Sequence, residues 1–339
     1  MSGRPASDPF LARLAEAILI PPFPGTTAPG WLLAALGRGL AGVTLFSPNV
    51  SDPDQLAALT SQLRNAADEP VIAIDEEGGD VTRLAHRTGS PYPGSAALGA
   101  VDDTELTARI YRALGSDLAA AGINTNLAPS ADVNSAPDNP VIGTRSFGAD
   151  TSLVARHVAA AVTGLQSGVA ACVKHFPGHG STRNDSHHGI AAVDGDLEQL
   201  RRRDLPPFVA AIAAGVQAVM PGHLLVSGLT GGMPATWSAA ALTGLLRGEL
   251  GFTGAIVSDA LEMRAVSDPL GVPEAAVRAV RAGVLRATAR PLTRGRRTQA
   301  WEVSVVDAAG ALVATGRVRL LVLEPEAAVG GAEIGSKGT

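Results

Sequence analysis

Four of the seven histidines of this chain lie in one glycine-rich stretch, KHFPGHGSTRNDSHHGI, at residues 174–190. Within it, Asp185 stands two positions before His187, close enough in an irregular loop for its carboxylate to accept the imidazole Nδ1–H. Such a contact orients the ring and raises its basicity, so the pair could donate and accept protons at a reacting bond. Two other interpretations stay open. One is a metal site, although no zinc spacing such as HExxH or paired cysteines is present, and the other is a solvated polar loop.

A carboxylate and a guanidinium occur together in DEEGGDVTRL, residues 75–84. Asp75 ends an apolar run, a glycine pair allows a sharp turn, and Arg83 follows eight residues later. Because a carboxylate accepts and an arginine donates in fixed geometry, the two side chains could hold neighbouring hydroxyls of a ligand. An ion pair within the loop is the alternative. Arg145, in the turn NPVIGTRSFG at residues 139–148, is open to the same two interpretations.

Polar side chains also end two further apolar runs. Lys174 and His175 close the run that precedes the histidine-rich stretch, and Asp259 ends the strongly apolar part of GAIVSDALEM, residues 254–263. A carboxylate at such a position is costly unless it is hydrogen-bonded or used in chemistry. Asp259 could therefore be a nucleophile, a base or the cap of a following helix.

Short apolar strands that alternate with longer helical patterns must position these side chains. The predicted strands are 17–23, 42–46, 71–75, 123–129, 170–176, 216–223 and 254–260, and the helical patterns between them include 52–67 and 104–122. Nearly continuous apolar strands separated by helices indicate a parallel sheet, and seven such units favour an α/β protein with a (β/α)8 TIM-like barrel over an open sheet. The carboxyl ends of barrel strands form one rim. We therefore expect the polar residues that end these runs to meet there, namely Asp75, Asn126, Lys174, His175, His223 and Asp259.

Composition narrows the class of protein. The 339 residues are 46% hydrophobic and 17% charged, which is typical of a globular protein with one large domain or two smaller ones. The single Cys172 excludes an intramolecular disulfide framework, and we expect a buried, reduced thiol. A net charge of −5 gives no general attraction to nucleic acid or anionic membrane. We find neither a signal peptide nor an apolar run of about 20 residues, so we expect a cytoplasmic protein.

After residue 283 the pattern changes. Residues 284–325 have little helical period and predict three β-strands, with a hairpin turn at 307–310. The last residues, 326–339, predict a disordered tail. The expected organisation is a barrel domain at 1–283, a short β-rich segment at 284–325 and the tail.

Four of these stretches together resemble glycoside hydrolase family 3, in its β-N-acetylglucosaminidase (β-N-acetylhexosaminidase) branch. The family pattern D-x-E-G-G-x-V-x-R-L, N-P-V-I-G-x-R-S-F, K-H-F-P-G-H-G-x-T-x-x-D-S-H and S-D-x-L-x-M is matched in order by DEEGGDVTRL, NPVIGTRSF, KHFPGHGSTRNDSH and SDALEM. The likeness spans about residues 10–283. It implies a barrel enzyme, a retaining glycosidase that hydrolyses terminal non-reducing β-N-acetylglucosamine residues in the recycling of peptidoglycan fragments.

The resemblance also implies a role for each motif residue. Asp259 would be the nucleophile that forms a covalent glycosyl-Asp intermediate, and His187, oriented by Asp185, would be the acid–base group. The sugar hydroxyls would be held by Asp75, Arg83, Arg145, Lys174 and His175. No metal or other cofactor is implied. The expected partner is a small carbohydrate, an N-acetylglucosamine-containing muropeptide or chitooligosaccharide, and we expect a monomer that binds neither nucleic acid nor membrane.

Two features depart from the family pattern. Ser181 stands where the family usually has Asp, and after Gly283 the family continues with an apolar eighth strand and a final helix. Here residues 284–325 instead resemble the closing strands of a hotdog-fold thioesterase, so the barrel can be incomplete at its eighth unit. The replaced C-terminus leaves open a catalytically disabled sugar-binding barrel. An N-acetylglucosaminide phosphorylase stays open because a neutral imidazole would not repel phosphate, and a metal-dependent hydrolase that uses the histidine-rich stretch is the third alternative.

Overall fold

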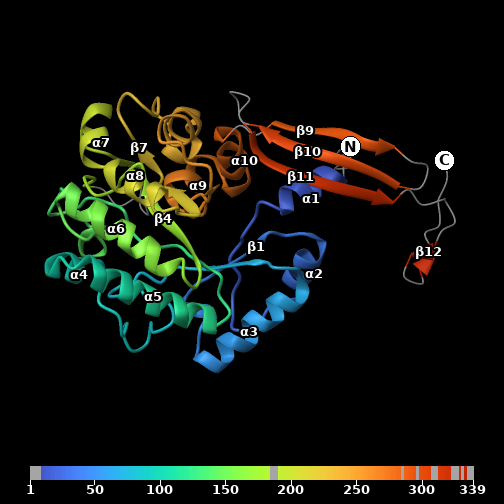
Figure 1. Ribbon diagram of the computed structural model, residues 1–339, viewed down its shortest axis with the longest axis horizontal. Helices are drawn as coiled ribbons and strands as arrows, with labels where there is room; N and C mark the ends of the chain where they lie inside the picture. Colours follow the sequence, from blue (N-terminus) through green and yellow to red (C-terminus); the bar gives the residue numbers. More distant parts are fainter. Residues whose placement is uncertain are drawn as a thin grey trace.

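A parallel sheet of six strands, in the order β1-β2-β3-β4-β6-β8, forms the centre of the protein (Figure 1). The computed structural model describes residues 9–183 and 190–283, and the backbone of the strands at 286–294, 298–306, 312–321, 328–329 and 332–333. The central strands are β1 (Gly42–Leu45), β2 (Val71–Ile74), β3 (Thr125–Asn126), β4 (Ala170–Phe176), β6 (Ala218–Pro221) and β8 (Ala255–Ile256). Within the described part of the chain no strand joins β8 to β1, so the protein is an incomplete (β/α) barrel, as predicted.

Six of the seven predicted central strands are confirmed, and the prediction at 17–23 is wrong. Pro21 and Pro22 carry no N–H, so this segment cannot form a regular ladder. It still lies along β1, because the main-chain N–H of Thr44 donates to Pro21 O (3.3 Å) and its hydroxyl donates to Ile20 O (3.0 Å).

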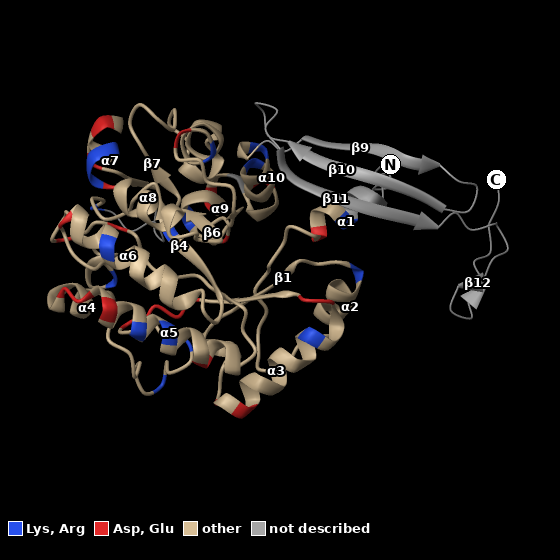
Figure 2. Ribbon diagram, viewed as in Figure 1, with Lys and Arg blue, Asp and Glu red and all other residues tan. Residues whose placement is uncertain are grey.

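Helices follow most of the strands along the chain. They are α1 (Pro9–Glu16), α2 (Gly30–Arg38), α3 (Pro53–Ala66), α4 (Ser95–Val101), α5 (Thr104–Ala120), α6 (Thr151–Leu165), α7 (Leu197–Arg203), α8 (Pro206–Ala213), α9 (Arg264–Leu270) and α10 (Val272–Ala282). Short 3-10 turns occur at η1 (Ser47–Asn49), η2 (Gly143–Arg145) and η3 (Ala235–Trp237), and η4 (Ala240–Glu249) is a π-helix. Helix α5 packs against α6, and α6 against α8. Charged residues are spread over the helices around the sheet (Figure 2).

Aspartate side chains cap the starts of two helices. Helix α3 begins after Asp52, whose carboxylate accepts the N–H of Gln55 (2.8 Å), and α5 begins after Asp103, which accepts that of Leu106 (2.9 Å). Both helices confirm the periodic patterns at 52–67 and 104–122. Among the described residues, no helix has the length and apolar character needed to cross a membrane.

A small apolar cluster lies on the strands themselves. It consists of Ala73, Leu127, Cys172, Ala218 and Met220, whereas the larger core packs strands against helices. Cys172 is completely buried and unpaired, and burial raises the pKa of its thiol to about 12. This confirms the predicted buried thiol.

The C-terminal strands form sheets of their own. Strands β9 (Arg286–Arg294), β10 (Thr298–Val306) and β11 (Leu312–Leu321) are antiparallel in the order β11-β10-β9, and this confirms the three predicted strands. Strand β9 therefore does not pair with the central sheet as the eighth strand of the barrel. The predicted turn at 307–310 lies outside the described residues. In the predicted tail, β12 (Ala328–Val329) and β13 (Ala332–Glu333) form a short antiparallel pair.

Candidate active site

Lys174 is the centre of a buried charge network at the carboxyl end of the sheet. It lies in β4, it is 2% exposed, and its Nζ is 2.6 Å from Asp75 Oδ1 and 2.7 Å from Glu77 Oε1. Asp75 directly follows β2, and Glu77 begins the loop after it. The ends of β2 and β4, two parallel strands with β3 between them, thus bring the cation and the two carboxylates together, as expected at the rim of a barrel.

Glu77 also binds Arg145, which ends the η2 turn. Its two carboxylate oxygens accept from Arg145 Nε (2.9 Å) and Nη2 (2.7 Å), the bidentate geometry that guanidinium and carboxylate prefer. Burial disfavours the charge on Glu77, but the Lys174 and Arg145 cations hold the pKa of this carboxyl well below its usual value. Glu77 therefore stays ionised and fixes both cations at the site.

Arg83 completes this side of the site. Its Nη2 lies 3.5 Å from Asp75 Oδ2, and its guanidinium lies over the Phe46 ring, 5.9 Å from the centroid. Its Nε is buried and has no hydrogen-bond acceptor within the described residues. The preceding turn requires the glycine pair, since Gly78 and Gly79 have φ of +80° and +56°. The ion pair that we considered from sequence exists, but it leaves Arg83 with donors for a ligand.

Two further buried carboxylates, Glu76 and Asp132, bind Arg83 and His175. Glu76 is buried, and its Oε2 accepts the N–H groups of Arg83 (2.7 Å) and Leu84 (3.0 Å), while burial raises the pKa of its carboxyl. Asp132 is fully buried, and its Oδ2 lies 2.8 Å from the ring Nδ1 of His175. Burial opposes the charge of Asp132, yet its contacts with His175 and His179 lower the pKa of the carboxyl.

Asp259 lies three residues after β8, and its N–H donates to Pro221 O at the end of β6 (3.3 Å). Burial disfavours its charge, but attraction to His175, His223 and Lys174 and the N–H of Ala260 hold the pKa of this carboxyl below its ordinary value. Helix α9 begins at Arg264 with Met263 as the preceding residue, so Asp259 does not cap a helix. An ionised carboxylate near the Lys174 cation remains, and this suits a nucleophile or a base.

Asn126 and His223, which we also expected at the rim, bind the main chain of their neighbours. Asn126 accepts the N–H of Glu76 (3.0 Å) and donates to its carbonyl (2.8 Å). His223 Nε2 lies 2.9 Å from Ala260 O, and Nδ1 lies 2.9 Å from the Thr236 hydroxyl. Both residues support the loops that carry the site.

The predicted acid–base pair, Asp185 and His187, lies outside the described residues, so their roles stay predictions. The structure brings together five of the other predicted residues, Asp75, Arg83, Arg145, Lys174 and His175, and it binds Asp259 to the end of β6, the strand next to β4. In the ranges 9–183 and 190–283, no group of three or more His, Cys, Asp or Glu side chains could hold a metal ion.

Sequence reasoning missed Glu77 and Asp132. Both had a signal, because Glu77 stands two residues after Asp75 and Asp132 follows the predicted strand 123–129 by three residues. The same rule that selected Asp75, a polar residue just after an apolar strand, would have found them.

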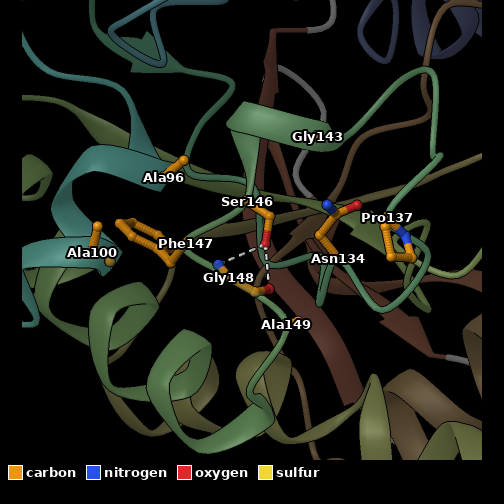
Figure 3. Close-up of a pocket in the computed structure, with 10 residues that line it drawn as sticks. Ala96, Ala100, Asn134, Pro137, Gly143, Ser146, Phe147, Gly148 and Ala149 are labelled. Atoms are coloured by element: carbon orange, nitrogen blue, oxygen red, sulfur yellow. Dashed lines mark hydrogen bonds between the residues drawn. The ribbon is translucent and has the colours of Figure 1, made fainter.

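Two cavities adjoin the segment that carries Arg145. The smaller one, about 210 Å³, is lined by Glu77, Arg145 and Thr144 together with residues of α4. The larger one, about 500 Å³, lies between α4 and the segments around Asn134 and Gly148, and none of the predicted site residues lines it. Figure 3 shows this larger cavity, with Ser146 hydrogen-bonded to the main chain of Gly148.

Comparison with known proteins gives consistent results. A model of the glycosyl hydrolase family 3 N-terminal domain matches residues 34–288. Beta-hexosaminidase A of Pseudoalteromonas piscicida is 36% identical over 282 residues, which are 76% of this chain and 47% of that protein. A Stenotrophomonas maltophilia beta-hexosaminidase is 38% identical over 241 residues, 69% of this chain and 71% of that protein.

Solved structures agree. A family 3 beta-N-acetylglucosaminidase from Paenibacillus sp. superposes with a TM-score of 0.78 at 44% identity, covering 81% of this chain and 53% of that one. Native NagZ from Neisseria gonorrhoeae gives 0.72 at 30% identity, with 79% of each chain covered. This chain spans about half the length of the Pseudoalteromonas and Paenibacillus proteins.

Proposed function

Because this chain belongs to glycoside hydrolase family 3, we propose that it hydrolyses terminal non-reducing β-N-acetylglucosamine residues with retention of configuration. Relatives named beta-hexosaminidase and beta-N-acetylglucosaminidase support this activity. The observation that carries the proposal is the place of Asp259, whose N–H donates to Pro221 O at the end of β6, next to β4 with Lys174 and His175 at its end. That arrangement offers a nucleophile beside groups that can hold a sugar.

In the first step of the proposed reaction, an Asp259 oxygen attacks the anomeric carbon. The bond from that carbon to the leaving oxygen breaks, and His187 gives its proton to the leaving oxygen. The product is a covalent ester between the sugar and Asp259. Asp185 would hold the imidazole of His187 in the orientation that this transfer requires.

In the second step, water attacks the anomeric carbon while His187 takes one of its protons. The bond to Asp259 breaks, the carboxylate is regenerated, and two successive inversions leave the configuration retained. A histidine suits both steps because a group that titrates near neutral pH can donate and then accept a proton.

The remaining site residues would hold the sugar hydroxyls. Lys174 has three N–H groups, and Asp75 and Glu77 occupy two, which leaves one for a hydroxyl. The Arg83 side chain is 28% exposed, so its guanidinium can provide a further donor. Asp75 supplies acceptor oxygens. Arg145 is bound to Glu77, and the His175 ring lies next to the Arg145 guanidinium.

We further propose that the substrate is an N-acetylglucosamine-containing peptidoglycan fragment in the cytoplasm, and that residues 1–283 form the catalytic domain. The single, buried and protonated Cys172 suits a reducing compartment. A muropeptide and a chitooligosaccharide of equal length, assayed in parallel, would separate these two substrate classes.

The test is the initial rate on 4-nitrophenyl N-acetyl-β-D-glucosaminide. We expect turnover by the full chain and a loss of about 10³-fold or more in Asp259→Asn. His187→Ala should lose far more rate on substrates with poor leaving groups than on the nitrophenyl compound, since a good leaving group needs no acid. Folded protein that does not turn over this substrate would overturn the proposal, whether or not it binds N-acetylglucosamine.

A further inference from the structure

Asp132 is a buried carboxylate that accepts hydrogen bonds from three residues. Its Oδ2 accepts from the Ser130 hydroxyl (2.8 Å) and from His175 Nδ1 (2.8 Å). Its Oδ1 accepts the main-chain N–H groups of His175 (3.3 Å) and His179 (2.6 Å). A carboxylate offers about four lone-pair directions, so these contacts use its whole capacity. Asp132 has no direction left for a ligand and must act through His175 and His179.

The contacts of the His175 ring fix the position of its proton. An ionised carboxylate can only accept, so Nδ1 carries the hydrogen toward Asp132. On the other side of the ring, Nε2 lies 3.4 Å from Arg145 Nη2, and a guanidinium can only donate. Nε2 therefore presents its one lone pair to Arg145, and because 3.4 Å is long for a hydrogen bond, a hydroxyl closer to the ring can replace the guanidinium as its donor.

We infer that Asp132 is a positioning residue that makes His175 a hydrogen-bond acceptor for one hydroxyl of the bound sugar. The identity of that ligand rests on the proposed function. Lys174, Arg83 and Arg145 can only donate, so a hydroxyl that donates to His175 can also receive one of their N–H groups. The site thereby selects a hydroxyl over an ether or a deoxy carbon at that position.

Asp132 also anchors the start of the stretch that contains Asp185 and His187. The surrounding segment repeats this attachment, since Asn139 Nδ2 donates to His179 O (2.9 Å) and Ala136 N–H donates to Gly180 O (3.2 Å). A Cβ on Gly180 would lie 1.9 Å from Val133 O, so only glycine allows this approach. One carboxylate thus holds both a sugar-binding ring and the first residues of the predicted acid–base loop.

The test is Asp132→Asn, which keeps the size of the side chain. The amide oxygen can still accept main-chain N–H groups, while the NH2 faces Nδ1 and drives the ring to the Nε2–H tautomer, a donor facing Arg145. We expect kcat/KM to fall about 10–100-fold, the usual cost of losing a carboxylate that orients a functional histidine. Ser130→Ala removes one donor to Asp132 and leaves His175 untouched, so it is the matched control and should lose less than about threefold.

Two readouts separate positioning from a merely structural role. The ¹⁵N resonances of the His175 ring should show Nδ1–H in the wild type and Nε2–H in Asp132→Asn. In a double-mutant cycle, adding Asp132→Asn to His175→Ala should cost little more than His175→Ala alone, because the first residue acts through the second. Nε2–H in the wild-type ring, or effects on kcat/KM that multiply in the cycle, would overturn the inference.

Failure of the proposed function is distinguishable from failure of this inference. Calorimetric binding of N-acetylglucosamine and the ring tautomer need no turnover. A chain that lacks turnover but shows the tautomer change, with weaker sugar binding in Asp132→Asn, would refute the hydrolase and keep the positioning role. If Asp132→Asn does not fold in thermal unfolding, the wild-type tautomer alone decides.

Discussion

Replacing Glu77 by Gln should destabilise the protein far more than the same substitution in an equally short ion pair on the surface. The Glu77 and Lys174 side chains are each 3% exposed, and Glu77 also binds the Arg145 guanidinium through both oxygens. Glu77→Gln keeps the size of the side chain and one acceptor oxygen. It removes the charge that compensates two cations, and it points an NH2 group at one of them.

The size of the effect follows from burial. Removing one partner of a buried ion pair typically costs about 3–5 kcal/mol, because the other charge stays buried without compensation. Lys174 retains Asp75 at 2.6 Å, so we expect the lower end, about 3 kcal/mol. At about 2–4 °C per kcal/mol for domains approaching this size, the melting temperature should fall by about 6–12 °C.

The assay is thermal unfolding of the wild type, Glu77→Gln and the control Glu198→Gln. Glu198 lies in α7, a helix with several charged residues (Figure 2), and it pairs with Arg201 at the same 2.7 Å, but its side chain is 62% exposed. Such exposed pairs contribute about 0–1 kcal/mol, so the control should melt within about 4 °C of the wild type. Equal melting temperatures for the two variants would refute the argument that burial makes the Glu77 pair stabilising.

Three further predictions concern the pH dependence of stability, the close approach at Gly180 and the need for a metal. Folding lowers the pKa of Glu77 from 4.5, so its ionised carboxylate stabilises the protein above about pH 4.5, and this stabilisation is lost as the pH falls. Urea unfolding at pH 6 and pH 3 should therefore show that the difference in unfolding free energy between wild type and Glu77→Gln becomes smaller in acid. Gly180→Ala should cost about 1–3 kcal/mol through its contact with Val133 O, whereas Gly30→Ala, with open space at its Cβ, should be neutral or slightly stabilising in the same experiment. Hydrolysis of the nitrophenyl substrate should be unchanged by EDTA, and a loss restored by zinc would contradict the metal-free mechanism.

The sequence could predict those site residues whose position depends on one strand at a time. Asp75 follows β2, Lys174 and His175 lie at the end of β4, and Asp259 follows β8, so an apolar run with a polar residue after it was enough. The central strands were predictable for the same reason. The strand expected at 17–23 shows the limit of this rule, because apolar residues around Pro21 and Pro22 satisfy the pattern without the donors that a ladder needs.

Pairing between distant segments could not be predicted from one sequence. Glu77 meets Arg145 across 68 residues, and Asp132 meets His175 across 43. These contacts depend on which strands become neighbours and on how each loop turns back over the rim. The position of Asp132 after a predicted strand marks it as a candidate, but its role becomes visible only when the donors around this buried carboxylate are counted.

The absence of an eighth barrel unit from the described strands affects Asp259 more than the other site residues. The network around Lys174 comes from β2, β4 and the loops after β2 and β3, and each of these strands has neighbours on both sides in the sheet. Asp259 differs, because β8 is a two-residue edge strand paired only with β6 among the described strands, and Ala255 in it is exposed. A missing eighth unit would thus leave the sugar-holding groups in place and loosen the nucleophile. Weak catalysis together with full affinity for N-acetylglucosamine would therefore point to the edge of the sheet at Asp259 rather than to the sugar-binding groups.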